Sequence, residues 1–113
     1  MIVERPWGTY EVLTEGENFL VKRLVVYPGG RLSYQSHESR EEIWHVAAGS
    51  GIMTLDDVEF DVSYKHQINI SIESKHRIHN KSDSELIIIE IQFGYPLIEE
   101  DIIRYIDDYG RIE

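Results

Sequence analysis

Hydrophobic residues along this chain fall into short runs that are separated by turn-forming residues. Residues 19–27 are rich in valine and leucine and end at Pro28, Gly29 and Gly30, a strong turn signal. Residues 67–72 alternate polar side chains with isoleucine, the pattern of a strand with one buried face. Residues 86–93 form the strongest β-branched run of the chain. We therefore expect a protein built mainly from β-strands.

Further strands are expected at residues 32–37, 42–48, 52–55 and 58–62. Asp56 and Asp57 separate the last two, and aspartate tolerates the left-handed backbone conformation of a tight hairpin turn. Residues 98–108 have acidic residues early and apolar ones at roughly helical spacing, which predicts a short C-terminal helix. Short strands with turn signals every ~8–12 residues predict an all-β barrel or jelly roll. No crossover helix is available for a parallel α/β fold.

The length of 113 residues fits one domain over residues 1–113, and a hydrophobic share of 42% is enough for a buried core. The sequence has no cysteine, which excludes disulfides, thiolate zinc fingers, iron–sulfur clusters and thiol catalysis. No apolar stretch approaches the ~20 residues that cross a bilayer, and the first residues do not form an apolar signal segment. We expect a cytoplasmic protein without a membrane partner.

The formal net charge is −10, from 21 acidic and 11 basic residues. Such a charge opposes binding to an extended phosphate backbone, so we expect no nucleic-acid partner. It does not exclude one small anionic substrate, because a single phosphate needs only a few converging Arg or Lys side chains.

A series of polar residues at fixed spacing is the most distinctive chemical feature of the chain. Its members are Gly29, Gln35, His37, Glu42 and Gly49, with His76 further along. Gln35 and His37 are two residues apart, so on a strand their side chains point to the same face. Two imidazoles, a carboxylate and an amide oxygen brought together inside a barrel would form a nitrogen and oxygen site for a divalent metal.

This spacing resembles the first motif of the cupins, a superfamily with a double-stranded β-helix (jelly-roll) fold, and His76 followed by Asn80 resembles the end of the second motif. Further segments resemble the C-terminal cupin domain of type II mannose-6-phosphate isomerases. They are residues 5–8, residues 31–35, Arg40, Glu42, Trp44, residues 100–104 and residues 107–111. In many bacteria that domain follows a mannose-1-phosphate guanylyltransferase, and here we expect it as a stand-alone domain.

The resemblance implies a metal held by Gln35, His37, Glu42 and His76. Glutamine at the first ligand position is itself a mark of these isomerases. The ligand set suits Zn²⁺ best, and Mn²⁺, Fe²⁺ or Ni²⁺ are also compatible. The implied reaction converts mannose 6-phosphate, or a related sugar phosphate, into the ketose. The resemblance also favours a homodimer, in which a strand at residues 2–4 is available to pair with a neighbour's sheet edge.

Isomerisation requires a Lewis acid, a base that reaches the proton on C2, and a cationic anchor for the phosphate. Three candidates for the base remain open: Glu42, a metal-bound hydroxide and Glu90. Glu90 has the parity of Ile88 and Gln92 on the expected strand, and the sequence does not decide whether that face is inside or outside. Both Glu42 and Glu90 are therefore catalytic candidates.

Arg40 and Arg77 are the preferred residues for binding the substrate phosphate, because each adjoins a metal-motif residue and a guanidinium matches phosphate geometry. The next choices are Lys22, Arg23 and Arg31. We further expect ion pairs at the C-terminal end to hold the tail over the barrel. They would join Arg104 and Arg111 to Asp107 and Asp108.

The second motif departs from the family pattern, because the usual Pro-x-Gly before the histidine is replaced by residues 71–75, Ser-Ile-Glu-Ser-Lys. This departure predicts a relaxed turn beside His76 and keeps open a non-catalytic cupin that binds metal and sugar. A second alternative is a metal-dependent oxygenase. Gln35 argues against the oxygenase, because such sites generally use more imidazole ligands.

Overall fold

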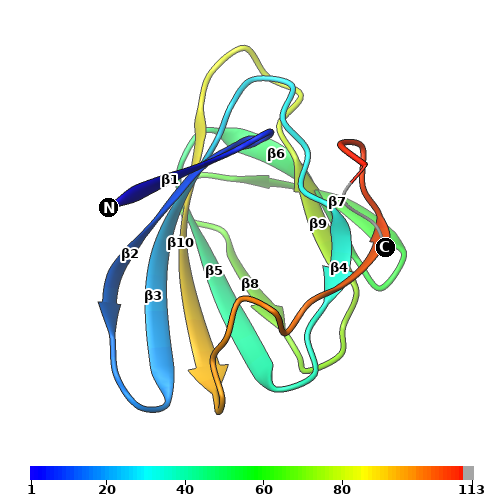
Figure 1. Ribbon diagram of the computed structural model, residues 1–113. Helices are drawn as coiled ribbons and strands as arrows, with labels where there is room; N and C mark the ends of the chain where they lie inside the picture. Colours follow the sequence, from blue (N-terminus) through cyan, green and yellow to red (C-terminus); the bar gives the residue numbers. More distant parts are fainter. Residues whose placement is uncertain (111–113) are drawn as a thin grey trace.

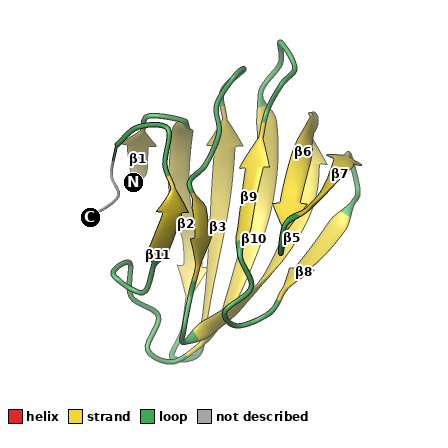
Figure 2. Ribbon diagram, turned by 90° about the vertical axis from the view of Figure 1, so that its right-hand side faces the viewer, coloured by secondary structure: helices red, strands yellow, loops and turns green. Residues whose placement is uncertain are grey.

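The structure, a computed structural model, describes residues 1–110 and consists of two antiparallel β-sheets that face each other (Figures 1 and 2). The first sheet contains, in spatial order, β1 (Ile2–Arg5), β2 (Gly8–Glu15), β3 (Phe19–Val26), β10 (Leu86–Gly94), β5 (Arg40–Ala48) and β8 (Gln67–Ile70). The second contains β11 (Ile103–Ile106), β4 (Tyr34–Ser36), β9 (His76–His79), β6 (Ser50–Leu55) and β7 (Val58–Ser63). Residues 1–110 contain no helix, and hence none long and apolar enough to cross a membrane.

Apolar side chains from both sheets fill the space between them. The first sheet contributes Leu24, Val26, Trp44, Val46, Ile68, Ile70, Leu86 and Ile88. The second contributes Met53, Val62 and Ile78, and Trp7 and Leu32 join from connecting segments. Fully burying one aliphatic side chain contributes about 1.5–3 kcal/mol, so this shared core is what holds the sheets together.

The inward faces of β5 and β10 change character along their length. On β10, Leu86 and Ile88 are buried in the apolar core, and the next inward positions are Glu90 and Gln92. Glu90 lies opposite Trp44 on β5, and Gln92 lies opposite Glu42. One end of the barrel is therefore packed with apolar side chains, while the other is lined by buried polar groups.

The hairpin between β6 and β7 confirms the predicted tight turn. Asp56 and Asp57 have φ values of 48° and 69°, the left-handed conformation that a type I′ hairpin turn requires at both central positions. The preceding turn contains Gly49 with φ at 82°. A Cβ atom on Gly49 would lie 2.5 Å from the carbonyl oxygen of Glu85, so both the conformation and the space require glycine.

All the strands that we predicted from the hydrophobic pattern are confirmed, although the one expected at residues 32–37 is limited to Tyr34–Ser36. β2 and β9 were not predicted. β1 pairs antiparallel with β2 of the same chain. The homodimer stays a prediction.

The predicted C-terminal helix is wrong, because residues Ile103–Ile106 form the edge strand β11. β11 pairs antiparallel with β4, and Arg104 lies opposite Gln35. The hydroxyl groups of Tyr105 and Ser36 lie 2.8 Å apart and form a hydrogen bond. The open edge of β4 offers backbone hydrogen bonds and side-chain contacts that outweigh a weak local helix propensity.

The C-terminal tail crosses from β10 to the second sheet, as the orange and red segment in Figure 1 shows. Arg31 fastens it, because its Nε and Nη2 donate to the two carboxylate oxygens of Asp108 at 2.7 Å each. The cation that pairs with Asp108 is therefore Arg31 in place of the expected Arg104, and Nη2 of Arg77 lies 3.8 Å from Oδ1 of the same carboxylate. Arg111 lies outside the described residues.

Candidate metal centre

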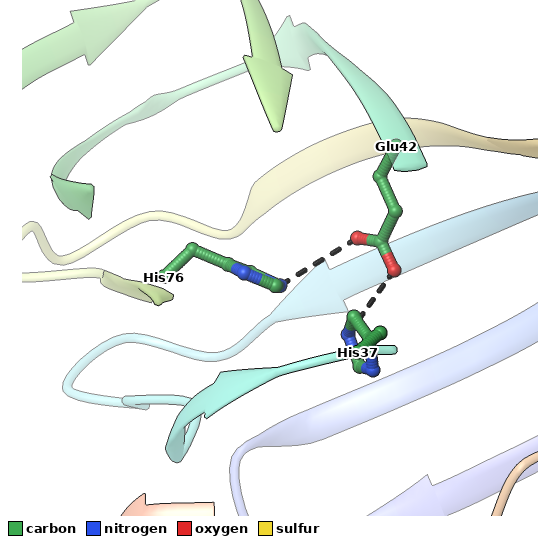
Figure 3. A group of neighbouring side chains, drawn as sticks. All are labelled: His37, Glu42 and His76. Atoms are coloured by element: carbon green, nitrogen blue, oxygen red, sulfur yellow. Dashed lines mark ion pairs between the residues drawn. The ribbon is translucent and has the colours of Figure 1, made fainter. Parts of the chain in front are cut away.

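Three of the four predicted ligands meet at the polar end of the barrel (Figure 3). His37 follows β4, Glu42 lies on β5 and His76 begins β9, so both sheets contribute. One ligand atom from each residue lies within 4.8 Å of the others. The carboxylate of Glu42 is 3.2 Å from Nε2 of His37 and 3.7 Å from Nε2 of His76.

The backbone fixes the tautomer of both histidines. Nδ1 of His37 donates to the carbonyl oxygen of Asp101 at 2.6 Å, and Nδ1 of His76 donates to that of Ser74 at 3.0 Å. Each Nε2 therefore carries its lone pair toward the cluster. Nε2 of His76 is buried and has no hydrogen-bond partner. A buried acceptor without a partner is costly in a metal-free protein, and a cation at this position would satisfy it.

Both histidines are neutral at physiological pH. Burial, with smaller contributions from the charge of Arg40 and from the neighbouring His76, lowers the pKa of His37 to about 3. Burial also lowers the pKa of His76. Neutral imidazole is the form that coordinates a metal, so the donor set fits a divalent ion.

Two donors hold the carboxylate of Glu42 in place. Nε of Arg40 donates to Oε2 at 2.8 Å, and Nε1 of Trp44 donates to Oε1 at 2.9 Å. Nη2 of Arg40 also lies 3.1 Å from Nε2 of His37. Arg40 is thus buried inside the cluster, where its charge compensates that of Glu42.

Gln35, the fourth predicted ligand, lies on β4 directly opposite His76. Its amide nitrogen donates to the hydroxyl oxygen of Ser33 at 2.9 Å. The amide oxygen is therefore the atom that would coordinate a metal. Gln35 lines the same cavity as Glu42.

A cavity of about 170 Å³, which we call the barrel pocket, opens beside the cluster. It is lined by Arg5, Trp7, Tyr10, Lys22, Leu24, Leu32, Ser33, Gln35, Arg40, Glu42, Trp44, Glu90, Glu99, Ile102 and Arg104. Four of these residues are cationic and three are carboxylates, although the protein as a whole is strongly acidic. The pocket therefore combines a metal-binding wall with positive charge suited to a small anion.

Glu90 faces the interior of the barrel, which decides the orientation that the sequence left open. Its side chain is buried and lines the barrel pocket, and Nε2 of Gln92 donates to its Oε2 at 3.1 Å. Burial, together with the nearby carboxylate of Glu42, raises the pKa of Glu90 to about 7. A carboxyl group with this pKa exchanges protons readily at neutral pH.

The structure does not bring Arg77 to this site. Its Nε and Nη2 donate to the carbonyl oxygen of Leu32 at 3.0 and 2.9 Å, and the side chain lines a different cavity, together with Arg31 and His79. The reason is parity: His76 and Ile78 on β9 point inward, so Arg77 between them points outward.

Lys22, which we considered a weaker candidate than Arg77 for binding the phosphate, lines the barrel pocket instead. Its parity on β3 is that of Leu24 and Val26, both in the core. That alternation was readable in the sequence and could have placed Lys22 inside. His45, His66 and His79 lie outside the metal cluster.

The turn before His76 is closed by hydrogen bonds instead of relaxed. The amide of Ser74 donates to the carbonyl oxygen of Ser71 at 3.1 Å, and the amide of Glu73 donates to that of His37 at 2.8 Å. Glu73 adopts φ of 68°, a conformation that glycine adopts more easily. The departure from the family motif has therefore changed the residues of this turn without opening it.

Comparisons with known proteins identify the family of this chain. Residues 1–108 match the family described as mannose-6-phosphate isomerase C-terminal. The chain is 44% identical over 109 residues to the alginate biosynthesis protein AlgA of Pseudomonas aeruginosa and 39% identical to a mannose-1-phosphate guanylyltransferase of Escherichia coli. Each match covers 96% of this chain but only 23% of the relative. The chain therefore spans about a quarter of the length of these relatives.

A solved structure of similar fold is a sugar phosphate isomerase of the cupin superfamily from Silicibacter pomeroyi. It superposes with a TM-score of 0.73 at 16% sequence identity, over 80% of this chain and 61% of that one. The predicted double-stranded β-helix is confirmed by this similarity and by the two facing antiparallel sheets.

Proposed function

The chain belongs to the family of mannose-6-phosphate isomerase C-terminal domains, and on that premise we propose that it is a metal-dependent isomerase of mannose 6-phosphate or a closely related sugar phosphate. One observation carries the proposal. The buried cluster of His37, Glu42 and His76, with an unsatisfied Nε2, lies beside a pocket that also holds a second buried carboxylate and several cations.

The proposed metal ligands are Nε2 of His37 and His76, the carboxylate of Glu42 and the amide oxygen of Gln35. A set of nitrogen and oxygen ligands suits Zn²⁺, and Mn²⁺, Fe²⁺ or Ni²⁺ are also compatible. A divalent ion bound there would act as a Lewis acid on the carbonyl and hydroxyl oxygens of the sugar. Arg40 and Trp44 orient Glu42 for this role through the hydrogen bonds that they donate to it.

Glu90 is the proposed general base, because it is the buried carboxylate of the barrel pocket that does not belong to the ligand set. It removes the proton from C2 while the carbonyl oxygen on C1 gains a proton, which gives an enediol. Glu90 then returns its proton to C1 as the hydroxyl group on C2 loses one, which gives the ketose. The hydrogen bond from Gln92 holds the carboxylate of Glu90 in position during both steps.

The phosphate group would lie against the cationic wall of the pocket. Arg40 remains a proposed contact, although its guanidinium also holds Glu42. Arg77 is not part of this wall, because it lines the other cavity. The further cations available in the pocket are Arg5, Lys22 and Arg104.

A coupled isomerase assay on the protein reconstituted with Zn²⁺ or Mn²⁺ tests the proposal. We expect conversion of mannose 6-phosphate to fructose 6-phosphate, and we expect His37→Ala to lose both the bound metal and the activity. His45→Ala serves as the matched control, since His45 lies on the other face of β5 and outside the cluster. Undiminished activity in His37→Ala would rule out the metal mechanism. A protein that binds metal without turnover on sugar phosphates would instead be a binding cupin.

A further inference from the structure

Lys22 is a buried cation at the wall of the barrel pocket. Its side chain is only 6% exposed, and the ammonium group lies 4.4 Å from the centre of the Tyr10 ring. A buried ammonium ion is costly unless an anion lies next to it. In this structure the anion is the carboxylate of Glu99, whose Oε1 accepts a hydrogen bond from Nζ at 2.7 Å.

Glu99, unlike its buried partner Lys22, lies at the surface. Its side chain is 59% exposed and belongs to the segment between β10 and β11. Burial alone would raise the pKa of Glu99, but the hydrogen bond and charge of Lys22 outweigh it and lower the pKa. The carboxylate is therefore ionised at neutral pH, and it reaches from an exposed segment to the wall of the pocket.

We propose that Lys22 is the anchor for the phosphate group of the substrate, and that Glu99 occupies this anchor as a built-in competitor until the phosphate displaces it. The inference rests on the proposed function for the identity of the ligand. It adds the residue that selects a phosphorylated sugar and the residue that limits its affinity.

Three features favour the exchange. A phosphate dianion carries more charge than a carboxylate and offers three acceptor oxygens to Lys22 and the neighbouring cations. Arg5, Arg40 and Arg104 line the same pocket, so the phosphate gains further partners there. Glu99 is largely exposed, so its carboxylate returns to water at little cost once the ion pair opens.

The exchange has two consequences for binding. A neutral sugar cannot displace a carboxylate from an ammonium ion, so the unphosphorylated sugar would leave the ion pair intact. Because Glu99 must leave Lys22 before phosphate can bind there, the observed affinity for phosphate is reduced by the fraction of molecules in which the anchor is free. Removing the carboxylate should therefore tighten the binding of phosphate.

Calorimetric titration of the full-length chain with inorganic phosphate, mannose 6-phosphate and mannose tests these consequences. Glu99→Gln should bind both phosphates about 3- to 10-fold more tightly, because the carboxylate that pairs with Nζ of Lys22 is then absent. Glu100→Gln is the matched control, since Glu100 is the adjacent exposed acid and does not line the pocket. Mannose should bind equally to all three proteins.

Lys22→Gln should bind both phosphates at least about 10-fold more weakly, which corresponds to about 1.4 kcal/mol. Lys22→Arg should retain part of the affinity, and Arg23→Gln is the control on the exposed face of β3. For the metal-loaded protein, the KM for mannose 6-phosphate should fall in Glu99→Gln and rise in Lys22→Gln. Glu99 is on the surface, so Glu99→Gln keeps the test decisive even where Lys22→Gln does not fold.

An unchanged or weaker phosphate affinity in Glu99→Gln would overturn the inference, and so would wild-type affinity in Lys22→Gln. The two proposals fail separately. Phosphate affinities that follow this pattern without turnover would support the anchor and reject the isomerase. Normal turnover, with phosphate affinities that do not change in the Lys22 and Glu99 variants, would support the isomerase and reject the anchor.

Discussion

Glu90 illustrates how position along a strand determines the chemistry of a side chain. Two residues earlier, Ile88 has the same orientation and fills the apolar core. Glu90 lies where the core gives way to the polar end of the barrel, close enough to apolar groups for burial to raise its pKa to about 7. The same orientation therefore gives a core residue at one position and a candidate base at the next.

Glu90→Gln should abolish most of the turnover, since glutamine keeps the shape of the side chain but cannot accept the C2 proton. The expected fall in kcat is about 100-fold or more, the usual contribution of a general base. Metal content should stay near that of the unchanged protein, because Glu90 is not among the proposed ligands. Glu85→Gln, at the exposed position just before β10, is the control. A kcat within a few-fold of the original would exclude Glu90 as the base.

At the level of strands and turns, glycines permit the connections that bring the two sheets together. Gly29 and Gly49 have nearly the same backbone conformation, with φ of 81° and 82°. Their surroundings differ, because nothing lies within 4 Å of a Cβ atom on Gly29, whereas the backbone of residue Glu85 blocks one on Gly49. Substitution at the two positions separates conformational strain from steric overlap.

Gly29→Ala should destabilise the protein by about 1 kcal/mol, the cost of a left-handed conformation for a residue with a Cβ atom. Gly49→Ala should cost about 3 kcal/mol or more, since the backbone at Glu85 must also move. Urea unfolding of both variants measures the difference. Equal losses of stability would show that the close contact at Gly49 does not contribute to the free energy of unfolding.

For the complete barrel, the metal-binding cluster connects the two sheets. Glu42 comes from β5 of the first sheet, whereas His37 directly follows β4 and His76 begins β9, both strands of the second sheet. A bound ion would therefore add a link across the barrel at the end that lacks an apolar core. Because such an ion binds the folded state alone, it stabilises that state by mass action.

Removal of the metal by a chelator should lower the unfolding temperature. With the ion at about 100 times its Kd, the expected contribution is about 2.7 kcal/mol, which amounts to many degrees for a domain of this size. Scanning calorimetry with and without Zn²⁺ measures the shift. His76→Ala should show no metal-dependent shift, while His66→Ala should behave like the unchanged protein. An unfolding temperature that does not respond to metal would contradict the cluster's role.

Much of the fold could be predicted because strand-forming runs and the turn residues between them are local features of the sequence. The Asp56–Asp57 turn and the long runs of β3, β5 and β10 needed no distant contacts to be recognised. The C-terminal helix was predicted wrongly for the opposite reason. Residues Ile103–Ile106 follow the open edge of β4, a partner that lies far away in the sequence.

The residues of the candidate site also fall into two groups, those predicted from the sequence and those placed there only by the tertiary structure. The residue types and their resemblance to the two family motifs were enough to select His37, Glu42 and His76, with Gln35, as a set. Which cations accompany them depended on how the sheets face each other. That packing turned Arg77 toward the other cavity, enclosed Lys22 and Glu90, and brought Glu99 from the tail to the pocket, because contacts between distant strands have no signature in local sequence.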